Sequence, residues 1–431
     1  MMKLRIRNFA KISKADIEID GITIIAGNNN TGKSTVGKIL DSVFNSSYNI
    51  DEKMNKARID SLASMLRNEI EGSMARVNRS VRRYLPRTYR GFAKDLLECK
   101  EDEREELCKE YKNVLLLPQE EETKFTEKIL EKLEENLNIS NETFCTAIYT
   151  SYFGETFHEQ INSLYYFDEL AEITLSIKEK EIYLAFKNNE CIEAKRQHLD
   201  IFNTSLYIDD PFVIDELNNN LSFGISELPI QKRNILQKLM QKEEREVEEK
   251  TFLGLLANNK LEDIMQIIDS VANGKITKKQ KYMYQLAGES SKEIDVASLS
   301  TGLKAFLVLK QILLNGNLQD KDVIVLDEPE IHLHPEWQLL YAEIIVLLQK
   351  KFNFHIVVTT HSAHFLEALE LYSRKYEIAE RCNYYLTSLQ EEGVVFENVT
   401  ENISKIYKQM VDPALLLSRL REELDTENDK L

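Results

Sequence analysis

The alternation of apolar and charged residues predicts strands and one helix in the first fifty residues. Residues 3–8 (KLRIRN) and 14–19 (KADIEI) alternate as half-buried strands do. The β-branched run at 21–27 (GITIIAG) is typical of a strand covered on both faces. Residues 28–44 (NNNTGKSTVGKILDSVF) then turn and continue with helical periodicity. The pattern therefore predicts three strands, a loop and a helix.

Two charged helical stretches divide the remaining strands. Helical periodicity over about 52–145 is followed by hairpin-like alternation at 172–186 and a strand pattern at 205–215. A second charged helical stretch covers about 212–272, and two buried-type strands follow at 323–330 and 354–362. We expect an α/β fold: a central mixed sheet with helices on both faces, an antiparallel β part and two helical insertions. The expected domains are the first half of the core (1–50), a charged helical insertion (51–150), an antiparallel β subdomain (151–211), a second helical insertion (212–285), the second half of the core (286–375) and a strand–helix tail (376–431).

Charge and cysteine content narrow the class of protein. The 431 residues carry 55 Lys+Arg and 72 Asp+Glu, a net charge of −17, so contact with nucleic acid would need a local basic patch. The five cysteines are scattered and form no C-x-x-C pair, which disfavours zinc and disulfides and favours a reducing cytosol. No apolar run approaches the roughly 20 residues of a membrane span. We expect a cytoplasmic protein without a membrane partner.

The sequence GNNNTGKS at 27–34 fits the pattern G-x-x-x-x-G-K-[ST] of a phosphate-binding loop. A chance match is the alternative, but this one follows a predicted strand and opens a predicted helix, as the motif requires. Lys33 would reach the β- and γ-phosphates of ATP, and the Ser34 hydroxyl would bind Mg²⁺. The predicted nucleotide-binding residues of the loop are Gly27, Asn28, Asn29, Asn30, Thr31, Gly32, Lys33, Ser34 and Thr35.

Polar residues end the two later strands. Asp327 and Glu328 follow a buried strand, where the aspartate could hold Mg²⁺ and the glutamate could activate the attacking water. A solvated acidic turn is the alternative, which the phosphate loop makes less attractive. His361 ends the next strand, where it could contact the γ-phosphate. A lone histidine is usually structural, so this prediction depends on its neighbours.

The motifs LSTGLK (299–304), VIVLDEPEIHLHP (323–335) and VVTTHS (357–362), after the phosphate loop, resemble those of ATP-binding-cassette ATPases. Within them the chain looks most like the soluble SMC/RecF/OLD branch of AAA-type ATPases. The matching motifs cover 1–45 and about 290–375 and leave the two insertions poorly covered or uncovered.

The resemblance implies roles for further residues. Ser300, Thr301 and Gly302 would be a signature turn that binds the γ-phosphate held by another subunit, so the protein would form an ATP-dependent dimer. Residues 330–335 would be the loop facing that partner, and His361 a switch histidine. The chain departs from these families at Thr301, where glycine is usual, and in lacking a clear metal-sensing glutamine. Asp209 or Asp210, in YIDDPF, would take that place as a metal ligand.

A basic run in the first insertion is the candidate for nucleic-acid binding. It contains seven basic residues, and its 3–4 spacing places several on one helix face. The alternative is an ordinary charged helical hairpin with the acidic stretch at 98–110. The basic residues are Arg76, Arg79, Arg82, Arg83, Arg87, Arg90 and Lys94.

Three functions remain open from the sequence. The first is an ATP-driven dimeric switch that controls a separately encoded effector such as a nuclease, because the motifs resemble those of anti-phage defence ATPases, including the Septu type. The residues after His361 are too few for the nuclease domain that OLD-type proteins append there. The second is a RecF-like DNA-repair ATPase without a toxic partner. The third is a transporter motor, which the charged insertion after the phosphate-loop helix disfavours.

Overall fold

The computed structural model describes residues 2–73, 85–114, 122–197, 199–219, 227–240, 253–288, 292–316 and 318–410. The chain divides into two compact units. Unit 1 contains Met1–Tyr48 and Ser151–Leu431, and unit 2 contains Asn49–Thr150. The phosphate loop, the acidic strand end and the signature turn all belong to unit 1.

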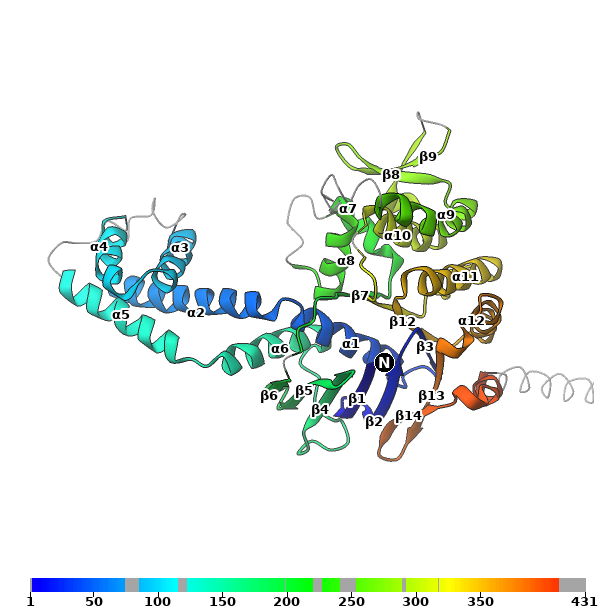
Figure 1. Cartoon of the computed structure of the whole chain (residues 1–431), viewed down its shortest axis with the longest axis horizontal. Helices are drawn as coiled ribbons and strands as arrows, with labels where there is room; N and C mark the ends of the chain where they lie inside the picture. The colour runs from blue at the N-terminus through cyan, green and yellow to red at the C-terminus, as the bar shows by residue number, and fades with distance from the viewer. Residues whose placement is uncertain are drawn as a thin grey trace, which may run out of the picture. The chain divides into compact units, whose positions relative to one another are not determined.

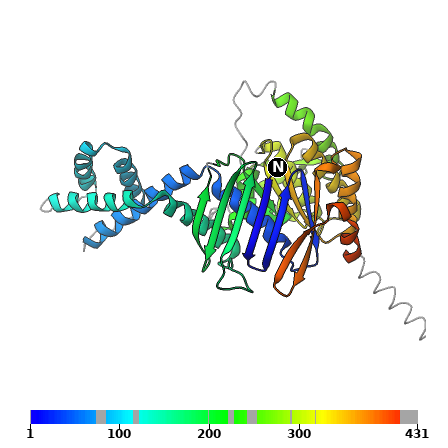
Figure 2. The same cartoon turned by 60° about the horizontal axis from the view of Figure 1, so that its bottom comes forward.

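Unit 1 is built on an 11-stranded sheet with the order β6-β5-β4-β1-β2-β14-β13-β3-β12-β11-β7. Figure 2 shows the blue N-terminal strands between the green and orange ones, so the first strands of the chain occupy the middle of the sheet. The strands are β1 (Met2–Phe9), β2 (Ile12–Ile19), β3 (Ile22–Gly27), β4 (Ala171–Ile177), β5 (Lys180–Lys187), β6 (Glu190–Arg196), β7 (Ser205–Ile208), β11 (Val323–Asp327), β12 (His355–Thr360), β13 (Cys382–Gln390) and β14 (Gly393–Asn398).

The sheet has a parallel part and an antiparallel part, as the predicted mixed sheet requires. Strands β13, β3, β12, β11 and β7 run parallel. Of these, β3, β12, β11 and β7 are short runs rich in buried β-branched or apolar residues. Strands β6, β5, β4, β1 and β2 pair antiparallel and alternate buried with more exposed residues over much of their length. Because the carboxyl ends of parallel strands meet at one edge, the loops after β3, β11 and β12 come together.

Helices cover both faces of the parallel strands. Helix α1 packs against β3, β7, β11 and β12, while α10, α11 and α12 share a hydrophobic core with the opposite side chains of these strands. Figure 1 shows α10, α11 and α12, in yellow to orange, gathered on one side of the sheet. The helices of unit 1 are α1 (Lys33–Ser47), the end of α6 (Asn141–Phe157), α7 (Glu216–Asn219), α8 (Ile230–Met240), α9 (Leu253–Val271), α10 (Thr301–Asn315), α11 (Pro335–Phe352) and α12 (Ala363–Lys375), with the short 3-10 helices η3 (Pro211–Asp215), η5 (Val296–Ser298), η6 (Ala379–Arg381) and η7 (Thr400–Asn402).

Unit 2 is helical and has a core of its own. Its helices are α2 (Ile50–Ser73), α3 (Leu85–Glu98), η1 (Glu101–Glu103), α4 (Arg104–Val114), α5 (Glu122–Asn138) and the start of α6. Buried residues at helical spacing, such as Leu62, Leu66 and Ile70 on α2, pack against Phe92 and Leu133. The Arg58 guanidinium donates to the carbonyls of Asn136 (2.6 Å) and Ile139 (2.9 Å), which closes the end of α5.

The structure differs from the sequence expectation within two segments. Helix α6 continues to Phe157, into the region expected to be β, because its aromatic residues pack on β1 and β5: the ring of Phe157 lies 4.8 Å from that of Phe9, and that of Phe153 lies 4.8 Å from that of Phe186. The segment expected to be a helical insertion at 212–285 contains a hairpin, β8 (Gly274–Lys278) and β9 (Tyr282–Leu286), which forms a three-stranded sheet with β10 (Glu293–Asp295). Tyr282 and Tyr284 of the hairpin are buried in the core.

Candidate nucleotide-binding site

The phosphate loop joins the end of β3 to the start of α1, as the sequence predicted. Its shape requires glycine at 27, where φ is 152° and an added Cβ would lie 2.0 Å from the Thr387 hydroxyl of β13. At Gly32 φ is 73°, and at Asn30 it is 65°. The Thr31 hydroxyl donates to the carbonyl of Asn28 at 2.7 Å and lies 2.6 Å from the Thr387 hydroxyl, so β13 fixes the loop from outside.

The two side chains that open α1 point back into the loop. The Lys33 ammonium is buried and donates to the carbonyls of Gly27 (3.1 Å) and Asn28 (2.9 Å). The Ser34 hydroxyl donates to Oδ1 of Asp327 at 3.0 Å. Asn28 and Asn29 are exposed beside this lysine, and Thr35 is half-buried on the first turn of α1.

Asp327, at the end of β11, is held by side chains from three neighbouring elements. Besides Ser34, the Tyr207 hydroxyl of β7 donates to Oδ2 at 2.5 Å, and the Thr359 hydroxyl of β12 donates to Oδ1. Tyr207 and Thr359 were not identified from the sequence. The strand order was the missing information, because β7 and β12 flank β11 only in the folded sheet.

Glu328 has a left-handed backbone, with φ of 48°, which is uncommon for a residue other than glycine, asparagine or aspartate. Its N–H donates to the carbonyl (3.1 Å) and hydroxyl (3.0 Å) of Thr359, which hold this conformation. Its Oε1 lies 3.5 Å from Lys33 Nζ and 3.4 Å from His361 Nδ1. The turn therefore directs the carboxylate toward the phosphate loop instead of toward bulk solvent.

The signature turn forms the start of α10, with Ser300 as the N-cap. Ser300 is exposed, and its hydroxyl makes no capping hydrogen bond to the helix. Gly302 is buried against α11, and an added Cβ there would lie 2.9 Å from the Trp337 ring and 3.1 Å from the His332 carbonyl. Helix α10 packs on η3, α8, α9 and β8, whereas α1 packs on the sheet. The two helix starts are thus supported by different parts of unit 1.

The carboxylates of Asp209 and Asp210 have different surroundings. Asp210 caps η3 by accepting from the Phe212 N–H (2.8 Å) and pairs with the Lys232 ammonium (3.2 Å). Desolvation raises the pKa of Asp209; Lys38 opposes this shift and Asp327 adds to it. Asp209 therefore keeps the position as metal-ligand candidate, while Asp210 has a structural task.

A buried carboxyl group lies further along α1. Asp41 is fully buried and accepts a hydrogen bond from the Asn45 amide at 2.8 Å. Desolvation raises its pKa from 3.8 to about 7, and the hydrogen bond from Asn45 only partly opposes this. This group was not identified from the sequence.

The donor set fits a nucleoside triphosphate with Mg²⁺. Lys33 donates to loop carbonyls within a loop whose backbone can wrap a phosphate, and its ammonium is a suitable partner for the β- and γ-phosphates. Ser34 and Asp327 supply a hydroxyl and a carboxylate oxygen, both hard ligands suited to Mg²⁺.

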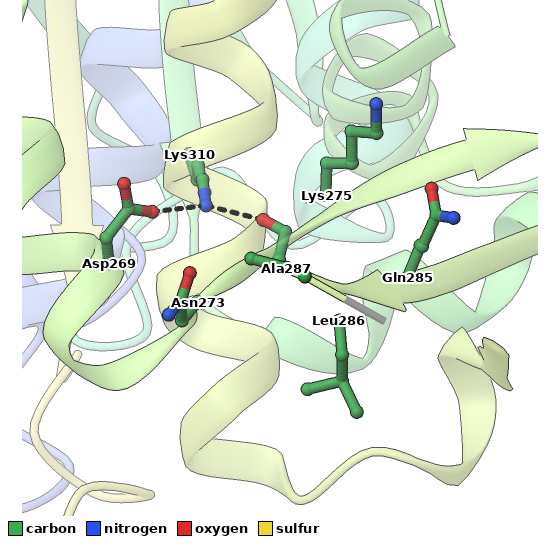
Figure 3. A pocket seen from close by; sticks show the side chains of 9 residues that line it. Asp269, Asn273, Lys275, Gln285, Leu286, Ala287 and Lys310 are labelled. Atoms are coloured by element: carbon green, nitrogen blue, oxygen red, sulfur yellow. Dashed lines mark hydrogen bonds and ion pairs between the residues drawn. The ribbon is translucent and has the colours of Figure 1, made fainter. Parts of the chain in front are cut away.

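A cavity of about 530 Å³ lies beside the β8–β9 hairpin, and the phosphate loop does not line it. Figure 3 shows the Lys310 ammonium directed at the Asp269 carboxylate at its edge; the two lie 2.5 Å apart. Lys310 also donates to the carbonyls of Ala272 and Gly274, so this buried cation is neutralised and hydrogen-bonded. Lys275, Asn273 and Gln285 make the rest of the lining polar.

A phosphate loop facing an Asp–Glu pair on a mixed sheet defines the class: a P-loop ATPase with the α/β fold of the ATP-binding-cassette type, as the sequence predicted. The chain belongs to the AAA ATPase domain family, whose profile matches residues 1–366. Among the described residues, no helix is long and apolar enough to cross a bilayer.

Similar proteins include ATPases and SMC heads. The chain is 35% identical over 88 residues to the retron Ec83 probable ATPase of Escherichia coli, covering 18% of this chain and 16% of that protein. It is 32% identical over 93 residues to the tungstate uptake system ATP-binding protein TupC of Campylobacter jejuni, covering 21% and 28%. The chain thus spans less than a third of the length of these curated relatives. The SMC head domain from Thermotoga maritima aligns with a TM-score of 0.37 at 11% identity, covering 92% of this chain and 98% of that one.

Proposed function

We propose that this ATPase is a dimeric switch that closes on Mg²⁺-ATP and opens after hydrolysis. In each site Lys33 and the loop amides bind the phosphates, and Ser34, Asp327 and Asp209 hold the metal ion. Bound Mg²⁺ would neutralise charge that develops on the phosphates. Glu328 orients and deprotonates the attacking water, and His361 contacts the γ-phosphate. The short distances among Lys33, Glu328 and His361 support these roles.

The observation that supports dimer formation concerns the hydroxyl group of Ser300. A serine N-cap usually accepts a hydrogen bond from its own helix, but this exposed hydroxyl makes none. The helix start therefore offers a hydroxyl and backbone N–H groups to an anion from outside the subunit. A γ-phosphate held by the phosphate loop of a second copy is the anion that fits the proposed cycle.

Mixed mutant subunits test the shared site. Lys33→Ala removes phosphate binding, and Ser300→Arg places a bulky side chain in the turn, so each homodimer loses both sites. A heterodimer of the two variants has one intact loop facing one intact turn. We expect the mixture to regain ATP hydrolysis or, if both sites must act together, ATP-dependent dimer formation in sedimentation. Normal hydrolysis by monomeric Ser300→Arg would contradict the shared site.

We further propose that the switch acts in the cytosol and controls a separately encoded effector such as a nuclease in anti-phage defence. The resemblance of its motifs to defence ATPases and its 35% identity to a retron's probable ATPase support this reading. The identity to an uptake-system ATP-binding protein supports a transporter motor, and a RecF-like repair ATPase is the third possibility. Co-purification of the tagged chain with the products of its neighbouring genes separates the three: a nuclease, a permease or a replication protein.

Nucleic acid is the proposed signal for the switch. Of the basic run, Arg76, Arg79, Arg82 and Arg83 lie outside the described residues. The described members Arg90 and Lys94 pair with Asp60 of α2 (2.9 Å) and with Glu98 of their own helix α3 (3.8 Å), so ordinary ion pairs within unit 2 account for that end of the run.

The β8–β9 hairpin offers a second basic surface. Residues 270–288 contain four lysines and no acidic residue, in a chain of net charge −17. Lys275, Lys278, Lys279 and Lys281 are all exposed, and Lys279 pairs with Glu293 at 2.6 Å. Strand β10 pairs with this hairpin and leads through η5 to Ser300. A nucleic-acid backbone bound to the hairpin would therefore be linked to the signature turn through β10 and η5.

A further inference from the structure

Glu330 follows the Asp–Glu pair and is the first residue of the loop that the sequence assigned to the partner-facing surface. Its side chain instead points inward, and the residue is only 2% exposed. The next residue, Ile331, is 52% exposed. The loop therefore changes from the protein interior to the surface within one peptide bond.

The Glu330 carboxylate is bound to the end of β12. Its Oε1 accepts from the Thr360 hydroxyl at 2.5 Å and from the His361 N–H at 3.2 Å, and it lies 3.8 Å from His361 Nδ1. Among the residues that the structure describes, no donor reaches Oε2, although this atom is buried. A buried carboxyl group with an unpaired oxygen is costly to keep for packing alone.

The backbone of Glu330 is bound to the opposite side of the same loop. Its carbonyl accepts from the Leu333 N–H (3.0 Å) and from the Gln338 side chain (3.3 Å), while the Ile331 N–H donates to the Glu328 carbonyl (3.2 Å). Glu330 and the N–H of the next residue thus join the turn that carries Glu328 to the strand end that carries His361. These are the two groups that lie 3.4 Å apart beside the phosphate loop.

We propose that Glu330 is a positioning residue for ATP hydrolysis, which sets His361 and Glu328 in their relative places through the Thr360 hydroxyl and the His361 N–H. The inference rests on the proposed function, in which Glu328 and His361 act on the γ-phosphate. The inference also gives a path by which the exposed part of this loop would affect ATP hydrolysis. A contact that displaces Ile331 would also displace the adjacent Glu330, which holds His361. Glu330 itself touches neither the phosphate loop nor the phosphates of ATP in this scheme. Its replacement should therefore affect turnover more than nucleotide binding.

The test compares four variants of the full chain by kcat, KM for ATP and thermal unfolding. Glu330→Ala removes both acceptor bonds, so kcat should fall about 10-fold or more while KM changes by less than about 3-fold. In Glu330→Gln the amide oxygen can still accept both bonds, so kcat should return to within about 3-fold of the parent. Thr360→Val removes the bond to Glu330 and also the one that the Thr360 hydroxyl accepts from the Ser362 N–H at 3.0 Å. Combined with Glu330→Ala it should cause clearly less loss than the sum of the two single changes, because both cut the same connection to Glu330.

Asp322→Asn is the matched control. Asp322 is an equally buried carboxylate at the other end of β11, where it accepts from Asn203 and from the N–H groups of Thr204 and Gln319. This variant should lower thermal stability and leave kcat within about 2-fold of the parent.

Three results would overturn the inference: a kcat within about 2-fold of the parent in Glu330→Ala, a loss of ATP affinity as large as its loss of kcat, or full additivity with Thr360→Val. The proposed function would still stand in each case if Glu328→Gln is inactive. A parent chain that does not hydrolyse ATP would overturn both.

Discussion

The hydroxyl of Ser34 lies 3.0 Å from Oδ1 of Asp327, although one residue opens the first helix and the other ends a strand near the far end of the chain. Helix α1 packs directly on β11, which brings the two oxygens together. Both are proposed ligands of Mg²⁺, so the packing of the protein itself holds two of the three proposed protein ligands beside each other. Preorganisation of this kind reduces the cost of ordering ligands when metal binds.

Glu328→Gln should retain ATP binding and lose hydrolysis by a factor of about 10² or more, because the amide cannot accept the proton of the attacking water. The bound ATP should then accumulate, and the fraction of dimer in sedimentation should rise. Single-turnover hydrolysis with radiolabelled ATP measures the loss. Turnover like that of the parent chain would remove Glu328 from the mechanism.

Tyr207→Phe should weaken the use of Mg²⁺ while sparing the fold. The Tyr207 hydroxyl donates to Asp327 Oδ2 at 2.5 Å, and loss of such an outer partner of a metal ligand typically costs about 10-fold or more in metal affinity. We expect the Mg²⁺ concentration for half-maximal ATPase activity to rise by about that factor. Tyr384→Phe, which alters a buried tyrosine of β13, is the control and should leave this Mg²⁺ concentration unchanged. Equal Mg²⁺ dependence in both variants would show that Tyr207 does not orient Asp327.

Asp41→Asn should make stability less dependent on pH. The folded-state pKa of about 7 lies above the ordinary value of 3.8, so between these values the folded chain binds more protons at this site than the unfolded chain. The free energy of unfolding therefore falls as pH rises through this window, by at most about 4 kcal/mol from this group. Asparagine stays neutral and avoids that loss.

Urea unfolding at pH 4, 6 and 8 checks the Asp41 prediction. The variant should gain stability relative to the parent as pH rises from 4 to 8. The exposed Asp320→Asn serves as the matched control and should show a pH-independent difference. A constant difference for Asp41→Asn as well would mean that this carboxyl group is ionised in the folded protein at neutral pH.

Charge reversal separates the two candidate nucleic-acid surfaces. If the basic run binds phosphates, Arg79→Glu, Arg82→Glu and Arg83→Glu together should abolish binding and leave basal ATPase activity unchanged. If the hairpin binds them, Lys275→Glu, Lys278→Glu and Lys281→Glu should do so instead. In either case the affinity for nucleic acid should fall steeply as salt is added. On duplex DNA the logarithm of the binding constant should fall against the logarithm of the salt concentration with a slope of about −0.9 per phosphate contact. Salt-independent binding, or binding that survives both triple changes, would assign both surfaces to ordinary solvated charge.

Local patterns were sufficient to predict the phosphate loop and the acidic strand end. Gly27 and Gly32 are required by the backbone shape of the loop itself, and Asp327 follows an uninterrupted buried strand, so these positions can be recognised without the rest of the chain. The α/β class followed in the same way from the short apolar runs of β3, β11 and β12.

The supports of the site could not be predicted, because they depend on which strands become neighbours. Tyr207, Thr359 and Thr387 read as ordinary strand residues, and only the order of the sheet places them beside Asp327 and Thr31. The burial of Glu330 could not be predicted for a related reason. This residue opens the loop that the resemblance assigned to the partner, and the inward turn of its side chain arises from the donors at the end of β12.

The position of β3 in the sheet has a consequence for how the protein is made. This strand spans residues 22–27, but both of its neighbours, β12 and β13, begin after residue 354. During synthesis the strand that carries the phosphate loop leaves the ribosome early and remains without sheet partners until almost the whole chain has followed. Such long-range pairing slows folding and leaves an apolar edge exposed to misassembly. Unit 2 makes its core from residues close in sequence and can form during this interval, so nascent chains should become protease-resistant there before any nucleotide can bind.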